Sequence, residues 1–574
     1  MARRTHRQSW RLLLLILALL VGVGGVVARL VQVQIIDHDY YATQAEDERL
    51  HRTVLRAPRG AILDRNGFSL VTTVDAFDVY IDPRSWGAEA VAQRAAELLA
   101  PLLDRQPAEL IAATRAQERG DYLAARSVSV EVGLRTRELA LPGVKMVGTS
   151  LRFYPEGDLA SNLLGFIGRD QVGLEGIEAS FDRELGGVPG VVYFERDALG
   201  NPIPFGRRLG DEPVPGGDLS LTIDRNIQRL AEGQLDQAIE QHEAKGGAII
   251  VMDPKTGEIL ALASRPSFRL TELDLEDASQ TPLFRNRVVT DAYAPGSVMK
   301  IITMAAAIDL GLVTPETTYY DSGVASVPGG HSIYNWDFSS NGTTTATEIL
   351  QRSINTGAVW LAGLLGADRF YDYVRRFGFG EATHAGLGGE AAGLVRTNED
   401  DGWYPGDLAT NSFGQGIAVT PLQMISAAAA LVNGGLLMRP YIVKEVAGPD
   451  GRRAYEPVVV RRVVTEETSR MLVQMMEAVV EDERRDHPAR VSGYQVGGKT
   501  GTSTFADREE TITSFVGFTP VRDPRFIMLV KIDEPQGARL GSTVAAPIFA
   551  ELAPQILTYL GVQPDDVARV ASGP

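Results

Sequence analysis

The stretch Ala294-Pro295-Gly296-Ser297-Val298-Met299-Lys300 begins an apolar segment that extends to Ile308. Pro295-Gly296 breaks the structure that precedes it, and the apolar residues that follow predict a buried helix. Ser297 then lies at the N-terminus of that helix, where the helix dipole favours a developing negative charge. Lys300 follows three residues later and shares the same helical face. A lysine can activate a serine nucleophile if burial or nearby cations keep it neutral.

Two further motifs support chemistry at this serine. By itself, Ser-x-x-Lys is more often a helix cap followed by a surface lysine. Ser353-Ile354-Asn355 follows Ser297 by 56 residues, and Lys499-Thr500-Gly501-Thr502 follows it by 202. Each of these is also ordinary alone, the first as polar helix surface and the second as a turn. In this order, however, the three motifs are those of penicillin-binding proteins and serine β-lactamases, and they predict an acyl-transfer site.

With these motifs, the sequence resembles the class B penicillin-binding proteins, which are peptidoglycan D,D-transpeptidases. The resemblance extends from the N-terminus to about residue 560. It implies a multidomain chain of α/β and α+β type, with an N-terminal transmembrane helix, an elongated mixed pedestal domain and a transpeptidase domain. The transpeptidase domain should resemble the serine β-lactamases, with an antiparallel sheet flanked by helices and an additional all-helical lobe.

The resemblance also implies domain limits. The cytoplasmic tail and anchor are expected at 1–29, and the pedestal, a dimerisation-type domain, at 30–235. The transpeptidase domain is expected at 236–562, followed by a short tail at 563–574.

Length and composition exclude several classes of function. A chain of 574 residues is too long for one hydrophobic core, and 44% hydrophobic with 22% charged residues is typical of folded domains. The net charge of −17 argues against nucleic acid as a partner, because phosphate binding needs a basic surface. The chain has no cysteine, which excludes disulfides and thiol catalysis. Its seven histidines lack paired ligand spacing, so neither a metal nor another cofactor is expected.

The N-terminus combines a basic cluster with an apolar run. Four arginines come first: Arg3, Arg4, Arg7 and Arg11. The next 17 residues, 12–28, are uncharged, which is the short end of what spans a bilayer. Because the arginines precede the run, the N-terminus is expected in the cytoplasm and the remainder outside. A signal peptide cleaved after Ala28 is the alternative, but the resemblance favours an uncleaved, single-pass anchor in the cell membrane.

Residues 56–67 match the first signature of the pedestal in the resembled family. Ile62-Leu63 predicts a strand, and Asn66-Gly67 predicts a hairpin turn. Judged by its residues alone, the segment is a structural hairpin with exposed charges. The resemblance implies that its arginines and Asp64 tie segments of the pedestal together, without a part in the chemistry. The motif residues are Arg56, Arg59, Gly60, Asp64, Arg65 and Gly67.

The remaining apolar segments predict the elements of the catalytic domain. Strands are expected at 248–252, 259–263, 513–518 and 526–530, and helices within 346–365, 420–433 and 544–560. A second Lys-Thr-Gly occurs at Lys255, but Asp253-Pro254 opens this segment and Gly257 closes it. We therefore interpret it as a turn and not as the third motif.

The resemblance implies a specific reaction. Ser297 attacks a stem peptide ending in D-Ala-D-Ala, the terminal D-alanine leaves, and an amine of a second stem peptide then takes the acyl group. Lys300 is the expected base for the serine proton. Lys499 places a second cation nearby, and two close ammonium groups disfavour double protonation. Lys499 is also expected to hold the substrate's terminal carboxylate, together with the Thr500 and Thr502 hydroxyls.

Ser353 and Asn355 complete the expected site. We expect them to relay a proton to the leaving amine and to orient the catalytic lysine. The backbone N–H groups of Ser297 and Thr502 would form the oxyanion hole, and Gly501 would let its strand approach the substrate closely. The segment from Asn411 to Gly416 resembles the floor of the family's cleft. Stem peptides and β-lactam antibiotics are the expected ligands.

Several other functions share parts of this pattern. A secreted β-lactamase would be much shorter and would need a deacylating carboxylate, for which the nearest candidate is Glu390, in a glycine-rich loop. A D,D-carboxypeptidase would hydrolyse the acyl-enzyme, and the large pedestal argues against both. Intact Ser297 and Lys300 argue against a non-enzymatic β-lactam sensor or division scaffold. A class A bifunctional synthase would need a glycosyltransferase domain, for which residues 30–235 leave little room.

A transpeptidase that cannot polymerise glycan needs a source of new strands. The resemblance implies a SEDS-type polytopic glycosyltransferase as partner, together with other division or elongation proteins. Ser-x-Asn as the second motif mildly favours division. The sequence does not distinguish a role in cell division from one in elongation. It also does not identify the acceptor amine or the oligomeric state.

Overall fold

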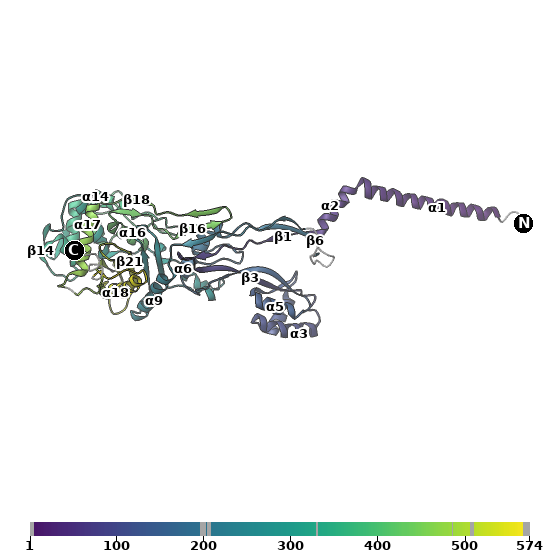
Figure 1. Cartoon of the computed structure of the whole chain (residues 1–574), viewed down its shortest axis with the longest axis horizontal. Helices are drawn as coiled ribbons and strands as arrows, with labels where there is room; N and C mark the ends of the chain where they lie inside the picture. Colours follow the sequence, from purple (N-terminus) through teal and green to yellow (C-terminus); the bar gives the residue numbers. More distant parts are fainter. Residues whose placement is uncertain are drawn as a thin grey trace. The chain divides into compact units, whose positions relative to one another are not determined.

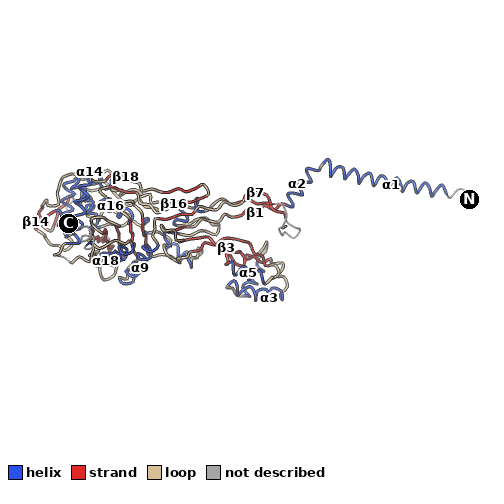
Figure 2. The backbone as a smooth tube through the Cα atoms, viewed as in Figure 1, coloured by secondary structure: helices blue, strands red, loops and turns tan. Residues whose placement is uncertain are grey.

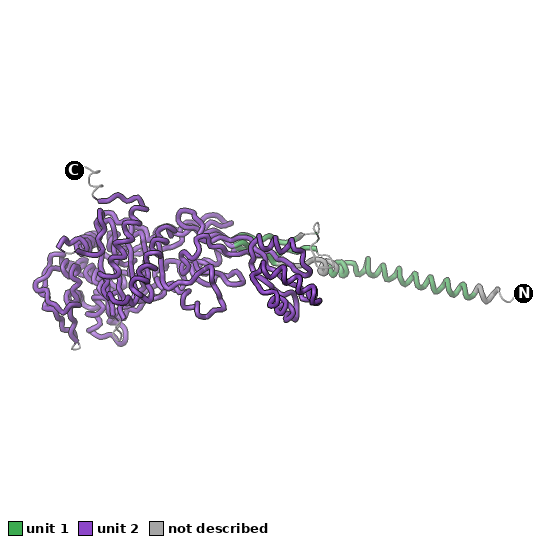
Figure 3. Tube along the Cα trace, turned by 90° about the horizontal axis from the view of Figure 1, so that it is seen from below, with its two compact units in different colours: residues 1–58, 187–215 green, residues 59–186, 216–574 purple. Residues whose placement is uncertain are grey.

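The computed structural model describes residues 5–195, 203, 208–328, 331–484, 486–504 and 510–565. The chain forms two compact units, which Figure 3 colours separately. Unit 1 comprises residues 1–58 and 187–215, and unit 2 comprises residues 59–186 and 216–574. Each unit is therefore built from two segments that are distant in the sequence. Arg3, Arg4 and the part of the predicted tail from residue 566 onward lie outside the described residues.

Unit 1 contains a long N-terminal helix and a small sheet (Figure 1). Helix α1 (Thr5–Val31) continues into a π-helical turn (Gln32–Ile36), and α2 (His38–Arg49) follows. Three antiparallel strands are ordered β1 (Leu50–Leu55), β6 (Gly190–Glu195) and β7 (Arg208–Asp211). The 27 helical residues Trp10–Ile36 are apolar and long enough to cross a bilayer, which suggests a membrane anchor.

Unit 2 contains a mixed seven-stranded sheet (Figure 2). Its path is β17-β16-β8-β2-β3-β4, with β5 also paired to β3. The strands are β2 (Ile62–Leu63), β3 (Ser69–Ile81), β4 (Tyr122–Ser129), β5 (Val144–Phe153), β8 (Asp218–Leu221), β16 (Val443–Gly448) and β17 (Gly451–Ala454). The predicted hairpin joins β2 to β3, and Gly67 supplies the required positive φ of 85°.

Two helices, α3 (Glu89–Leu99) and α4 (Pro107–Ala116), pack with β3 and β4 around a separate small core. A third helix, α5 (Val130–Glu138), contacts β3 and β4. Trp86 is the largest side chain of this core and is 1% exposed. Its indole Nε1 donates to the Pro142 carbonyl at 2.9 Å, so the polar end of the buried ring is satisfied.

A five-stranded antiparallel sheet organises the rest of unit 2. Its order is β10 (Ile259–Arg265), β9 (Gly246–Met252), β21 (Phe526–Asp533), β20 (Thr511–Thr519) and β19 (Gly497–Thr504). The four predicted strands are confirmed by β9, β10, β20 and β21. Strands β9 and β20 are buried along their whole length, because helices cover both faces of the sheet centre. The residues of β9 are glycine or apolar throughout, whereas β20 also contains buried threonine and serine residues.

Two groups of helices pack against this sheet. Helices α9 (Arg225–Gln241) and α18 (Ala545–Tyr559) contact each other and the sheet, with Phe549 of α18 edge-on to Phe515 of β20. The second group is α11 (Lys300–Asp309), α16 (Pro421–Val432) and α17 (Glu466–Glu481), of which α17 contacts β19. The predicted C-terminal and alanine-rich helices are confirmed.

Four more helices extend the second group into a helical lobe. They are α12 (Ala346–Gln351), α13 (Asn355–Leu365), α14 (Ala367–Arg376) and α15 (Pro405–Ser412). Helix α13 contacts both α11 and α15. The three sequence motifs therefore meet where α11, the α12–α13 connection and the edge strand β19 come together.

The helix at the predicted nucleophile begins later than the sequence indicated. Gly296–Met299 is a 3₁₀ turn, and α11 begins only at Lys300. Ser297 therefore lies at the N-terminal end of the helical segment as predicted, in a 3₁₀ turn that leads directly into α11. Gly296 has a φ of 55°, which right-handed α-helix does not allow, so the helix cannot extend back through Gly296.

Candidate active site

Close backbone packing fixes the turn that carries Ser297. A Cβ on Gly296 would lie 2.4 Å from the Thr502 carbonyl oxygen, so only glycine fits. The Gly296 amide donates to the Gly414 carbonyl at 3.0 Å. Gly414 belongs to the segment expected to form the cleft floor. The close packing of Gly296 thus positions Ser297 between β19 and the segment that contains Gly414.

Lys300 is buried beside Ser297. It is 1% exposed, and its Nζ lies 3.1 Å from Ser297 Oγ. The same nitrogen donates to the Ser353 carbonyl at 2.6 Å and to Asn355 Oδ1 at 2.8 Å. Burial lowers the pKa of Lys300 well below its usual value, and the charge of Lys499 lowers it further. The geometry and the shifted pKa both suit a general base.

The second motif occupies the connection between α12 and α13. Ser353 has a φ of 55°, a left-handed conformation that costs a non-glycine residue roughly 1–3 kcal/mol. Its hydroxyl lies 3.3 Å from Lys300 Nζ. Asn355 begins α13, and its Nδ2 donates to the Tyr334 carbonyl at 3.0 Å, which turns Oδ1 toward the lysine. The strained backbone therefore serves to surround the lysine with acceptors.

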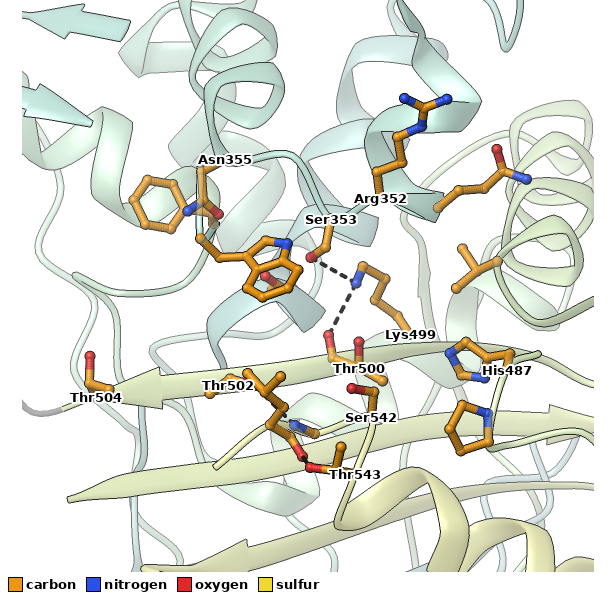
Figure 4. A pocket seen from close by; sticks show the side chains of 18 of the residues that line it. Arg352, Ser353, Asn355, His487, Lys499, Thr500, Thr502, Thr504, Ser542 and Thr543 are labelled. Atoms are coloured by element: carbon orange, nitrogen blue, oxygen red, sulfur yellow. Dashed lines mark hydrogen bonds between the residues drawn. The ribbon is translucent and has the colours of Figure 1, made fainter. Parts of the chain in front are cut away.

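The third motif is carried by β19, the edge strand. Lys499 is 1% exposed and donates to Ser353 Oγ at 3.0 Å and to the Thr500 carbonyl at 3.2 Å (Figure 4). Burial lowers the pKa of Lys499 to about 7. The Ser353 hydroxyl is within hydrogen-bonding distance of both lysines, so the three motifs form one connected cluster.

Gly501 and Thr502 hold β19 against the nucleophile turn. A Cβ on Gly501 would lie 2.6 Å from the Pro295 carbonyl oxygen and 2.4 Å from Ser514 Oγ. We expected Gly501 to allow close approach of a substrate. The atoms that a side chain at this position would meet belong instead to the protein itself. Thr502 Oγ1 accepts from the Gly541 amide at 3.0 Å. This strand is thus locked in place beside Ser297.

One cavity of about 660 Å³ is lined by six residues of the three motifs: Ser297, Ser353, Asn355, Lys499, Thr500 and Thr502. Figure 4 shows Arg352, Ser353 and Asn355 on its helical side and Thr500 and Thr502 on its strand side. The lining also includes Trp336, Phe413, Gln415, His487, Thr504, Leu540, Ser542 and Thr543. An extended peptide with a terminal carboxylate can therefore lie along β19 with its carbonyl at the serine.

A buried polar network behind the second motif was missed by the sequence reasoning. Asp321, at the end of β11 (Thr318–Asp321), is 0% exposed and accepts from Thr356 Oγ1 at 2.6 Å and from Asn335 Nδ2 at 2.8 Å. Asn335 Oδ1 in turn accepts from the backbone N–H groups of Asn355 and Thr356 at 3.1 and 3.2 Å. Because Ile354 has no polar side chain, Asn335 acts as the cap of α13.

The pedestal motif contains one buried ionic cluster. Arg59 Nε donates to Glu178 Oε2 at 3.0 Å, and Arg152 Nε donates to Glu178 Oε1 at 2.8 Å. Glu178 is 0% exposed. A Cβ on Gly60 would lie 1.9 Å from the Gly217 carbonyl oxygen, so this position also requires glycine. The cluster joins the segment before β2 to β5 and to the helix that contains Glu178.

The other pedestal residues are placed separately. Asp64 is 0% exposed, and its Oδ1 accepts from the amides of Asn66 and Phe68 at 2.8 and 2.9 Å within its own hairpin. Arg65 pairs with Glu258 at 3.0 Å. Arg56 is exposed and belongs to unit 1.

Two residues that the sequence analysis set aside lie away from the cavity. Lys255 occupies the turn between β9 and β10 and pairs with Asp523, as expected for a surface turn. Glu390 accepts hydrogen bonds from Thr383 Oγ1 and from the amides of His384 and Ala385 at 2.7–2.9 Å. Its carboxylate thus holds its own loop, and Glu390 is not among the described residues that line the cavity.

Family models and solved structures match both parts of this architecture. Residues 247–553 match the penicillin binding protein transpeptidase domain, and residues 54–221 match the penicillin-binding protein dimerisation domain. The fold is similar to penicillin binding protein 2X from Streptococcus thermophilus, with a TM-score of 0.74, 25% identity and coverage of 89% of this chain and 81% of that chain. It is also similar to penicillin binding protein 3 from Mycobacterium tuberculosis complexed with aztreonam, with a TM-score of 0.69, 28% identity and coverage of 89% and 98%.

Named relatives agree with these matches. The chain is 35% identical over 548 residues to stage V sporulation protein D of Bacillus subtilis, covering 93% of this chain and 83% of the relative. It is 31% identical over 573 residues to peptidoglycan D,D-transpeptidase FtsI of Escherichia coli, covering 97% and 93%. The chain belongs to the class B penicillin-binding proteins and is a serine-type peptidoglycan D,D-transpeptidase of cell-wall synthesis that binds β-lactams.

Proposed function

We propose that Ser297 carries the acyl group in this transpeptidase and that Lys300 is its base. The observation that carries the proposal is the 3.1 Å separation between Lys300 Nζ and Ser297 Oγ inside a buried cluster. Neutral Lys300 takes the hydroxyl proton while Oγ attacks the carbonyl carbon of the penultimate D-alanine. The peptide C–N bond then breaks, the terminal D-alanine leaves with an added proton, and an acyl ester remains on Ser297.

The other motif residues are assigned to binding and proton transfer. Ser353 Oγ, which lies between the two lysines, passes the proton to the leaving amine. Asn355 orients Lys300. Lys499, with the Thr500 and Thr502 hydroxyls, holds the substrate carboxylate, whose charge favours the protonated lysine. The backbone N–H groups of Ser297 and Thr502 stabilise the oxyanion.

The second half of the reaction uses the same groups in reverse. An acceptor amine attacks the ester carbonyl, an amide forms, and the proton lost by the amine returns to Ser297 Oγ. Water must not hydrolyse the acyl ester before the acceptor amine attacks it. Glu390 is held by its own loop, so a general base for water is not supplied from that position. Loss of one general base slows a step about 10²- to 10⁴-fold.

Adduct lifetime tests this assignment against a hydrolase. Penicillin should label the full-length protein stoichiometrically, and the adduct should last for many minutes or longer. Glu390→Gln should leave that lifetime almost unchanged. Turnover of penicillin at several molecules per second by the wild type would contradict the assignment.

We also assign residues 30–235 to the pedestal, 236–562 to the transpeptidase domain and 1–29 to a cytoplasmic tail with its anchor. The two family-model matches, 54–221 and 247–553, lie inside the first two limits. The arginines that precede the apolar run 12–28 favour a cytoplasmic N-terminus and an extracytoplasmic catalytic domain. A C-terminal alkaline phosphatase fusion should be active and stay in membranes. A soluble full-length product that starts after Ala28 would contradict the anchor.

A polytopic glycosyltransferase of the SEDS type is the proposed partner. A cross-linking enzyme needs newly polymerised strands, and the transmembrane helix and the pedestal are the surfaces available outside the transpeptidase domain. Co-purification should survive Ser297→Ala, because that change leaves the interface intact. It should be lost when residues 30–235 are replaced. A complex that persists without the anchor and the pedestal would show that the interface lies elsewhere.

A further inference from the structure

A second, smaller cavity adjoins the catalytic cavity on its helical side. It has a volume of about 150 Å³ and is lined by Asn335, Trp336, Asp337, Asn341, Arg352 and Ile354. Trp336 and Arg352 also line the catalytic cavity, so these two side chains form a wall that both spaces share. The mechanism proposed above uses neither Trp336 nor Arg352.

The segment that forms this cavity exposes aromatic rings at a cost in stability. Trp336 is 60% exposed and Phe338 is 78% exposed. Phe338 also has a φ of 58°, which is rare for a bulky residue and costs roughly 1–3 kcal/mol. Neighbouring exposed aromatic side chains are typical of surfaces that bind a partner or ligand. The strained backbone and the exposed rings therefore indicate a binding function for residues 334–341.

This segment is nevertheless rigidly supported. Asn335, between the exposed Tyr334 and Trp336, is 3% exposed and anchored by Asp321 and by the capped end of α13. Asp321 Oδ2 also accepts from the Asn341 amide at 2.9 Å, which pins the far end of the segment. The exposed rings are thus presented on a fixed base. A preorganised surface of this kind lowers the entropy cost of binding.

Arg352 provides a cation in the lining of both cavities. Its Nη1 donates to Asn341 Oδ1 at 3.2 Å and its Nη2 donates to Glu348 at 3.0 Å. These contacts use two of the five N–H donors of the guanidinium. The side chain is 34% exposed, so a ligand can reach the remaining donors. A guanidinium can bind a carboxylate through two parallel N–H donors.

The chemistry of acyl transfer indicates where the acceptor substrate binds. Attack by the acceptor amine on the acyl ester is acylation in reverse with a different amine, so the acceptor must enter where the leaving amine departed. Ser353 is the residue assigned to that proton, and Trp336 and Arg352 line the same cavity as Ser353. The helical side of that cavity is therefore available to the part of the acceptor beyond its amine.

We propose that Trp336 and Arg352 form the acceptor subsite of this enzyme, in which the Trp336 ring packs on the aliphatic part of the acceptor stem peptide and Arg352 pairs with one of its carboxylates. This proposal rests on the transpeptidase mechanism proposed above. It names the second substrate of the same site, an amine-bearing peptide with a free carboxylate. Donor binding along β19 does not require either residue.

The test compares two acceptors on one acyl-enzyme. Full-length protein in detergent is acylated by a thioester analogue of D-Ala-D-Ala, and transfer is measured with D-alanine or with an alanyl-γ-glutamyl-diaminopimelate tripeptide. D-alanine fills only the place of the leaving group, whereas the tripeptide extends beyond it. Arg352→Gln should raise the tripeptide concentration needed for half-maximal transfer about 10- to 100-fold, while that for D-alanine changes less than about twofold. Arg352→Lys should recover part of the loss, and Trp336→Ala should act in the same direction as Arg352→Gln.

The matched control is Arg376→Gln, because Arg376 also forms an exposed i,i+4 pair, with Asp372, on another helix of the same lobe. It should change transfer to neither acceptor. Equal losses with both acceptors would overturn the subsite, because they would mean that Arg352 acts through Ser353. Unchanged transfer in Arg352→Gln and Trp336→Ala would overturn it as well. If penicillin fails to label wild-type Ser297, the proposed mechanism is wrong, and the subsite proposal, which rests on it, is overturned as well.

Discussion

Lys300 Nζ lies 3.1 Å from Ser297 Oγ, and Lys300 is 1% exposed. A base in this position must be neutral, so acylation should become faster as pH rises through the pKa of Lys300. Burial, and secondarily the charge of Lys499, lower that pKa well below its usual value of 10.5. The rate constant for acylation by saturating penicillin should therefore reach its plateau well below pH 10.5. Stopped-flow labelling across pH measures this directly.

A variant at the second lysine checks the cause of that shift. Lys499→Met removes a positive charge, so it should raise the pKa of Lys300 and move the rising limb to higher pH. Saturating penicillin keeps weaker binding from distorting the comparison. A rising limb that stays in place would contradict the effect of Lys499 on the pKa of Lys300. A rate still increasing above pH 10.5 in the wild type would contradict Lys300 as the base.

Lys499 should also make stability depend on pH. Burial lowers its pKa from 10.5 to about 7, so between these values the unfolded chain binds more protons than the folded protein. The contribution of Lys499 to stability therefore rises with pH in that window, by at most about 1.4 kcal/mol per unit. Lys499→Met lacks this dependence. Its Tm relative to wild type should be highest near pH 7 and should decline toward pH 10, and a pH-independent difference would refute the shifted pKa.

Asn335 should affect acylation without touching the substrate. It accepts from the amides of Asn355 and Thr356, and loss of such a cap costs about 0.5–2 kcal/mol. Asn335→Ala should loosen the start of α13 and with it the Asn355 contact to Lys300. The acylation rate constant should fall roughly tenfold, a barrier change of about 1.4 kcal/mol, while the dissociation constant of the non-covalent penicillin complex stays the same.

Thr465→Ala is the control for that variant. Thr465 caps α17 by accepting from the Thr468 amide at 3.2 Å, so its loss should cost similar stability. The acylation rate of Thr465→Ala should equal that of wild type. If both variants slow acylation equally, Asn335 has only a structural role.

How much of this site the sequence revealed depends on the distance between the partners in the chain. Ser297 and Lys300 are three residues apart, so one helical turn brings them together and the spacing alone predicts it. Lys499 was predicted because its Lys-Thr-Gly motif follows the other two motifs in the chain order typical of the family. The capping of α13 by Asn335 gave no such signal, because it depends on how the segment after β11 folds back on the second motif.

Backbone details were also beyond the sequence. Ser353 adopts a φ of 55° only because contacts around it require that geometry, and nothing in Ser-Ile-Asn indicates it. The 3₁₀ turn at Ser297 is likewise fixed by contacts, because Gly296 packs closely against the Thr502 carbonyl. The long and strongly apolar elements, such as β9 and α18, were predicted well because burial there leaves little choice of residue.

The ionic cluster in the pedestal should be important for folding. Glu178 is 0% exposed and bonded to both Arg59 and Arg152. Glu178→Gln would leave the buried Arg152 without an anionic partner and Arg59 with Asp182 alone, and should destabilise the protein by about 3–5 kcal/mol. Thermal unfolding measures the loss, and native protein at low temperature should still bind penicillin.

Glu109→Gln supplies the comparison for an exposed pair. Glu109 pairs with Arg105 on the surface, where its side chain is 56% exposed. Such a pair contributes at most about 1 kcal/mol, so Tm should hardly change. A Glu178→Gln protein as stable as Glu109→Gln would show that the buried cluster does not hold the pedestal together.

Identification of the acylated residue is the most direct test of the central claim. Full-length protein is incubated with penicillin, digested and examined by mass spectrometry, beside Ser297→Ala and Lys300→Ala. We expect one penicilloyl group on the peptide that contains Ser297, none in Ser297→Ala and almost none in Lys300→Ala. A penicilloyl group on another residue, or labelling that persists in Ser297→Ala, would contradict the account.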